Sequence, residues 1–196
     1  FTASGARTAI APNLTAFTSF EDVRARELLA SQERFAQWKT WNKSLQNDPR
    51  IVTRYDFESN DSRLIDVGTT KSHGTIVGCE WTTGRWPQKR ALEFKRPGDR
   101  VRIDVPGEFD AITLTAWVRV DALPQRRQSL LLTDGYEIGH LHWQIGLKGD
   151  LRLGTRIPSQ GPRFASGYGS QTAFTPRQIG VWNFVCSVYD RSEGIV

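Results

Sequence analysis

The residues of this chain that could carry catalysis are few and scattered. The nearest pair of carboxylates is Glu108 and Asp110, which flank Phe109. Retaining glycoside hydrolysis needs two carboxyl groups about 5 Å apart, and on a strand this calls for acidic residues repeated along one face. The pair lies in a predicted turn and no second glutamate follows, so the sequence does not predict this chemistry.

Two further patterns in the sequence resemble metal and phosphate sites in part. His140 and His142 lie two positions apart on a predicted strand, hence on one face, but no third ligand matches them and ordinary strand histidines explain the pair. Gly167–Thr172 (GYGSQT) lacks the strand-to-helix setting of a phosphate loop and is predicted to be a flexible loop. Without a Ser/His/Asp signature either, the chain is predicted not to be an enzyme.

Composition and charge narrow the class of protein. The 196 residues suit one ordinary domain with an appendage, and 38% of them are hydrophobic, enough for a sizeable core. Residues 85–102 contain seven basic residues, which we interpret as a solvated face. Because no recognition helix or RNA-binding signature accompanies them, binding to nucleic acid is not expected. No apolar run reaches the roughly 20 residues that span a bilayer. Because the chain begins with Phe1 and has no Met, we expect a piece of a longer polypeptide, with any membrane anchor in the absent part.

The first third of the chain predicts an arm and a helix. Residues 1–18 are Ala/Thr/Ser-rich and predict a linker or extended arm. Residues 19–48 predict an amphipathic helix, with Ser19 as N-cap and acidic residues in the first turn. Its apolar stripe has three-to-four spacing and is expected to pack on the domain that follows, or else on a partner. The stripe consists of Leu28, Phe35, Trp38, Trp41 and Leu45.

From residue 51 onward, short β-branched and aromatic runs alternate with turn residues, starting with 51–57. The clearest strand is 111–119, in which Ile112, Leu114, Ala116 and Val118 share one face. Regular strands without intervening helices predict an antiparallel sandwich. After the strand that ends near Asp190, a turn leads into a return strand, so C-terminal strands are expected to be missing or supplied by another chain.

The two cysteines match no metal or redox spacing. Cys186 lies in the apolar run VWNFVCSVY, where a buried free thiol is expected. Whether Cys79 and Cys186 pair is left open.

Several motifs resemble the LamG-like (concanavalin A-like) jelly-roll domain. They are HGTIVGCEWTTGRWPQKRALEFKRPGDRVRIDVPGEFDAITLTAWVRVDAL from His73, HWQIGLKGDLRLG from His142 and GVWNFVCSVYDRSEGIV from Gly180. The stretch WNKSLQNDPRIVTRYDFES from Trp41 is similar to planctomycete-type envelope proteins in which a FecR-like periplasmic sensor region precedes such a domain. The resemblance implies a jelly-roll domain over 50–196, incomplete at its C-terminus, on the periplasmic or extracellular side of the envelope.

The same resemblance suggests where ligands would bind. It implies that 85–87 cross an end of the sandwich, with Trp86 covering the core and Ala91, Leu92 and Phe94 re-entering it; stacking of Trp81 and Trp86 on a sugar is the alternative. It also implies that loop carboxylates hold a calcium ion. The candidate calcium ligands are Asp56, Asp61 and Asp66, and the candidate stacking residues are Trp81, Trp86, Trp143, Tyr136 and Tyr168.

Three functions follow as expectations. The first is a non-catalytic recognition module for a glycan or a protein partner, as the C-terminal part of a membrane-anchored sensor. The second is a structural or assembly segment of a larger envelope complex, in contact with the rest of its parent polypeptide. The third, a glycoside hydrolase or lyase, rests on the fold alone.

Overall fold

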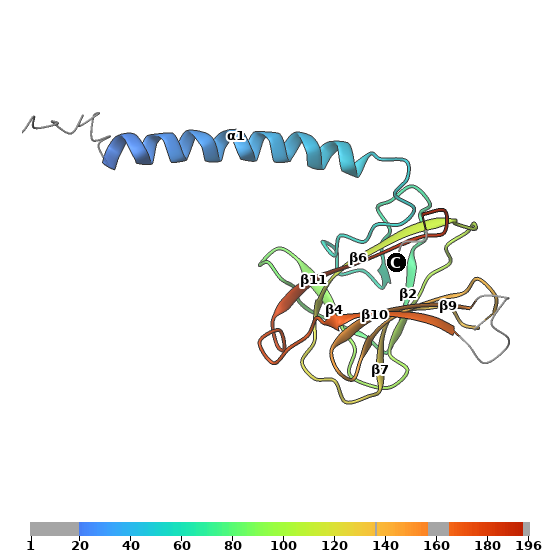
Figure 1. The fold of residues 1–196 in the computed structure, drawn as a ribbon. Helices are drawn as coiled ribbons and strands as arrows, with labels where there is room; N and C mark the ends of the chain where they lie inside the picture. Colours follow the sequence, from blue (N-terminus) through green and yellow to red (C-terminus); the bar gives the residue numbers. More distant parts are fainter. Residues whose placement is uncertain (1–19, 136, 157–164, 194–196) are drawn as a thin grey trace, which may run out of the picture. The chain divides into compact units, whose positions relative to one another are not determined.

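The computed structural model describes residues 20–135, 137–156 and 165–193. In this part of the chain the protein is mainly β, with antiparallel sheets preceded by one N-terminal helix, as predicted (Figure 1). The chain divides into two compact units. The first holds the residues up to Gly84 together with Gln88–Val105, and the second holds Arg85–Pro87 together with the residues from Pro106 onward. The predicted arm at 1–18 and the expected return strand lie outside the described residues.

The helix α1, Phe20–Gln46, confirms that a helix forms within 19–48, and the predicted N-cap Ser19 lies outside the described residues. Acidic Glu21 and Asp22 lie in its first turn and basic Lys43 in its last, where each complements the helix dipole. At the C-terminal end the Asn47 Nδ2 donates to the Lys43 carbonyl (2.9 Å), which satisfies one of the free terminal carbonyls.

No residue of α1 is buried, so its apolar stripe is not covered by the domain that follows; packing of the stripe on a partner stays a prediction. Phe35 and Trp38 stack on each other, with ring centroids 5.8 Å apart, and both rings stay more than half exposed. Arg34 lies one turn before Trp38 and two turns before Trp41, on the same face of the helix.

The first unit also contains a three-stranded sheet and a hairpin. The sheet has the order β1-β2-β5 and the hairpin pairs β3 with β4. Their bounds are β1 Arg63–Leu64, β2 Gly74–Val77, β3 Glu80–Thr83, β4 Arg90–Glu93 and β5 Arg100–Arg102. The predicted strand at 51–57 is reduced to one bridge between Tyr55 and Asp66, whereas 80–83, for which no strand is predicted, forms β3.

The second unit is a sandwich of a four-stranded sheet and a two-stranded ribbon. The sheet has the order β10-β9-β8-β7, and the ribbon pairs β6 with β11. Their bounds are β6 Ala111–Arg119, β7 Arg127–Leu132, β8 Leu141–Gly146, β9 Asp150–Arg156, β10 Ala165–Thr172 and β11 Trp182–Asp190.

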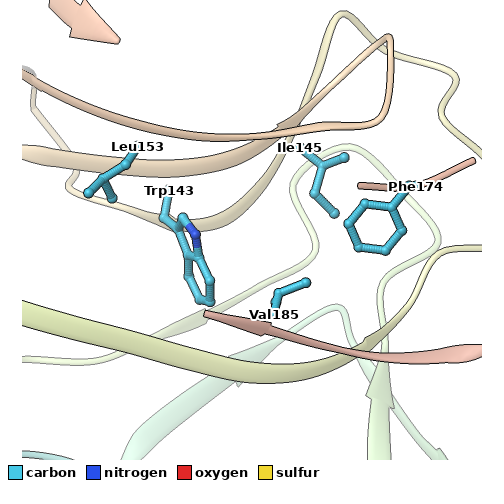
Figure 2. Packing of buried hydrophobic residues seen from close by; sticks show 5 residues of the cluster. All are labelled: Trp143, Ile145, Leu153, Phe174 and Val185. Atoms are coloured by element: carbon cyan, nitrogen blue, oxygen red, sulfur yellow. The ribbon is translucent and has the colours of Figure 1, made fainter. Parts of the chain in front are cut away.

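The core of the second unit lies between the sheet and the ribbon. Figure 2 shows Trp143 of β8 pointing from its sheet toward the strand that carries Val185. Trp143, Ile145, Leu153, Phe174 and Val185 form the buried cluster. The predicted inward face of β6 is confirmed, because Leu114, Ala116 and Val118 pack against this cluster.

Two local predictions in this unit are wrong. The Gly167–Thr172 segment is part of strand β10, because its glycines fit an antiparallel register with β9 in which Gly167 lies opposite Gly154. Cys186 is exposed, because strand alternation turns Val185 into the core and the next residue outward.

Candidate ligand-binding site

The outer face of the β6–β11 ribbon carries aromatic rings that remain open to solvent. Trp117 lies directly opposite Phe184 in the register, and their ring centroids are 5.3 Å apart with a tilt of 54°. The two residues are 45% and 55% exposed. A cross-strand aromatic pair of this kind stabilises the ribbon by roughly 0.2–1 kcal/mol, yet about half of each side chain is left uncovered.

Arg85 and Trp86 complete this surface. The Arg85 guanidinium carbon lies 3.3 Å from the centroid of the Trp117 ring and 4.2 Å from that of the Trp86 ring. Trp86 is itself 52% exposed. We call Arg85, Trp86, Trp117 and Phe184 the outer aromatic patch. All four residues belong to the second unit.

The local sequence explains why these side chains point outward. In β6 the exposed and half-buried positions alternate from Ala111 to Arg119, so Trp117 falls on the solvent face. In β11 the exposed positions include Phe184, Cys186 and Val188. Arg85 and Trp86 lie in the connection between β3 and β4, in which Gly84 donates its backbone N–H to the Lys89 carbonyl (2.9 Å).

The structure separates the predicted stacking residues. Trp86 belongs to the outer aromatic patch, and its exposure contradicts the expectation that it covers the core. Phe94, which was expected to re-enter the core, is 58% exposed. Trp143 is only 4% exposed and donates its indole N–H to the Ser187 Oγ (2.8 Å), so a stacking role does not fit its position. Tyr168 lies exposed on β10.

The remaining two candidates lie elsewhere. Trp81 is half-buried in the first unit, where its indole N–H donates to the Asp61 carbonyl (2.8 Å) and its ring meets Phe57 edge-on, with centroids 6.2 Å apart. Tyr136 lies outside the described residues.

Sequence reasoning missed Arg85, Trp117 and Phe184 as site residues. A signal for Trp117 was present, because the alternation of 111–119 puts it on the face opposite to Leu114 and Ala116. The same alternation around Val185 marks Phe184 as outward. Sequence alone offered no signal that Arg85 stacks on Trp117.

Asp66, a predicted calcium ligand, is a buried structural carboxylate. It is 1% exposed. Its Oδ1 accepts the backbone N–H groups of Arg54 (2.8 Å) and Gly68 (2.7 Å), and its Oδ2 accepts the Ser72 N–H (2.8 Å) and the Thr70 hydroxyl (3.0 Å). Burial opposes ionisation of this group, but the four donors outweigh it and hold the pKa of Asp66 below its ordinary value.

The predicted calcium site does not form from these residues. Both Asp66 oxygens are already taken by donors, and one oxygen of Asp56 accepts the Glu58 N–H (3.2 Å). Asp61 is exposed. In the described ranges, no group of three or more His, Cys, Asp or Glu side chains is arranged to hold a metal ion, and His140 with His142 recruits no third ligand there.

The other charged candidates are engaged in turns and surface pairs. Glu108 and Asp110 lie in the exposed connection before β6, where Asp110 faces Arg191 at 3.8 Å. Within the basic run, Lys89 pairs with Glu58, and Lys95 lies 3.1 Å from the Glu93 carboxylate. These contacts fit the interpretation of that run as a solvated face.

A hollow of about 430 Å³ opens beside the β8–β9 turn of the second unit. Leu123, Leu147 and Phe174 line it, together with Pro176 and Ile179. It offers apolar contact and the Lys148 side chain but no converging set of polar groups, which ordinary small-molecule sites have. The outer aromatic patch is therefore the stronger candidate.

Comparison with protein-family models, with curated proteins and with solved structures finds no match to this chain. In the part of the chain that the structure describes, no helix is both long and apolar enough to cross a bilayer.

Proposed function

We propose that this chain carries a non-catalytic recognition module that binds a glycan at the outer aromatic patch. The observation behind the proposal is the gathering of three half-exposed rings, Trp86, Trp117 and Phe184, at one end of a sheet face. Exposed aromatic residues that cluster on one surface commonly mark an interaction site. The C–H faces of a sugar ring pack on such rings as other apolar surfaces do, while its hydroxyls stay hydrated.

The resemblance to LamG-like domains supports the same proposal and extends it. It suggests an extracytoplasmic location, as the C-terminal part of a FecR-like membrane-anchored sensor. Glycoside hydrolysis ranks third, because Glu108 and Asp110 lie in an exposed connection rather than on a shared strand face.

The test is binding of the purified chain to a panel of polysaccharides, with and without calcium, by affinity electrophoresis and calorimetry. We expect binding that falls by about 2- to 12-fold in each of Trp86→Ala, Trp117→Ala and Phe184→Ala, from the roughly 0.5–1.5 kcal/mol that one aromatic contact contributes. Trp38→Ala is the matched control, since Trp38 is equally exposed but lies on α1. A folded protein that binds no glycan, or a loss equal in the control, would refute the proposal.

A structural or assembly role is the second candidate, and α1 is the observation that favours it. Phe35, Trp38 and Trp41 are all exposed on this helix, and a helix that buries nothing gains little stability from tertiary packing. A protein partner, such as another segment of the parent polypeptide, would cover them. Cross-linking and sedimentation of the chain, compared with a variant carrying alanine at these three positions, would detect assembly through α1.

A further inference from the structure

We infer that the outer aromatic patch selects glycans that carry carboxylate groups, with Arg85 as the residue that binds the carboxylate. The inference rests on the proposed glycan recognition and names the class of sugar involved, namely polymers of uronic acids. Arg85 is the only charged member of the patch as defined above, and it lies against two of the three aromatic rings.

The contacts with two rings hold the Arg85 guanidinium group at the patch, since its central carbon lies 3.3 Å from the Trp117 centroid and 4.2 Å from the Trp86 centroid. A guanidinium group carries five N–H donors, which can bind the oxygens of a ligand. In the described residues no carboxylate forms an ion pair with Arg85. Arg119, on the same face of β6, is by contrast paired with Asp121 at 3.0 Å. Arg85 is therefore a positioned cation whose charge no described acidic side chain balances.

Carboxylate is the chemistry that this arrangement fits best. The planar fork of an arginine matches the two oxygens of a carboxylate and binds them in bidentate fashion. In a uronic acid the carboxylate projects from the edge of a ring whose C–H face can pack on an aromatic residue. A sugar stacked on Trp86 or Phe184 would therefore bring its carboxylate alongside the rings, where the Arg85 donors lie. The net charge of +5 on the chain adds a weaker, long-range attraction of the same sign.

The test compares two forms of one polymer, polygalacturonate and its fully methyl-esterified form, which share a backbone and differ in the free carboxylate. We expect the chain to bind polygalacturonate about 10- to 100-fold more tightly, the range expected for a charge-assisted bond. Arg85→Gln should abolish this preference, so that the two polymers bind with equal affinity. Arg85→Lys should restore only part of it, since an ammonium lacks the planar fork.

Arg126→Gln is the matched control, because it removes one positive charge from an exposed arginine of the same unit that is not part of the patch. Near-UV circular dichroism of each variant reports whether the aromatic packing persists. A sulfated glucan, titrated at rising salt, distinguishes selection of carboxylate from general attraction of anions.

The outcomes separate this inference from the proposed function. Equal binding of both polymers, or equal losses in Arg85→Gln and Arg126→Gln, would overturn carboxylate selection and leave glycan recognition standing. Binding of the sulfated glucan as tight as that of polygalacturonate would overturn it in favour of unspecific charge attraction. A folded chain that binds neither polymer nor any neutral glycan would refute the proposed function itself.

Discussion

On the β6–β11 ribbon, neighbouring residues point to opposite faces, so that one is buried and the next is exposed. Val185 on the inner face is 6% exposed and packs in the core, while Phe184 beside it is 55% exposed. On β6, Ala116 faces the core and Trp117 faces solvent. A ribbon with a purely structural role needs apolar residues on one face only. The large rings on the second face stabilise the ribbon only slightly through their cross-strand contact, and their exposure directs attention to binding.

The largest expected effect is on stability, when one aromatic residue of the core and one of the outer face are each replaced by alanine. Trp143→Ala should lower the free energy of unfolding by about 3–5 kcal/mol, because it leaves a cavity in the core and removes the bond to Ser187. Phe184→Ala should lower it by about 1 kcal/mol or less. Urea titrations followed by far-UV circular dichroism would measure both. Equal destabilisation would mean that the outer face is covered in solution and would break the comparison.

A smaller difference in stability is expected between substitutions of a buried and of an exposed carboxylate. Asp66→Asn should cost about 1–3 kcal/mol near neutral pH, because the amide group would face the donors of Ser72 and Thr70. Asp61→Asn, at an exposed side chain, should be nearly neutral and serves as the control.

This difference should depend on pH in a defined direction. The pKa of Asp66 is lowered in the folded state, so its contribution to stability is fully present above the unfolded value of about 3.9 and is lost as the pH falls through the folded pKa. The gap between the wild type and Asp66→Asn should therefore narrow below about pH 4. Urea unfolding between about pH 3 and 7 would measure it, and a gap that is independent of pH would argue against an ionised Asp66.

The smallest expected effect is chemical rather than energetic. Cys186 is exposed on the outer face, whereas Cys79 is half-buried and its pKa is raised by burial and by the nearby Asp99 carboxylate. A thiol reagent at about pH 8 should modify Cys186 of the native protein on the order of tenfold faster. The fast phase should persist in Cys79→Ser and vanish in Cys186→Ser. Slow modification of Cys186 would show that this face is shielded.

The elements that the sequence predicts well are those with strong local periodicity. The helix α1 follows from its acidic first turn and helical spacing, and the two faces of β6 follow from alternation. Strand β3 was not predicted from its four residues, and the Gly167–Thr172 segment of β10 was interpreted as a loop. Glycine carries no alternation of its own, so the pairing of β10 with β9 depends on the partner strand.

In the candidate site, too, local periodicity predicts some features and only tertiary contacts decide the others. The sequence by itself determined that the chain is an antiparallel β protein behind a helix, and that Trp117 and Leu114 point to opposite sides of one strand, because the side-chain period of a strand is a local property. Only the tertiary structure decided that Trp143 is a core residue, that Asp66 is saturated by donors, and that Arg85 lies over Trp117 next to Phe184. Trp117 lies 32 residues after Arg85 and 67 residues before Phe184, and contacts between segments so distant depend on strand pairing and packing, which no local pattern encodes.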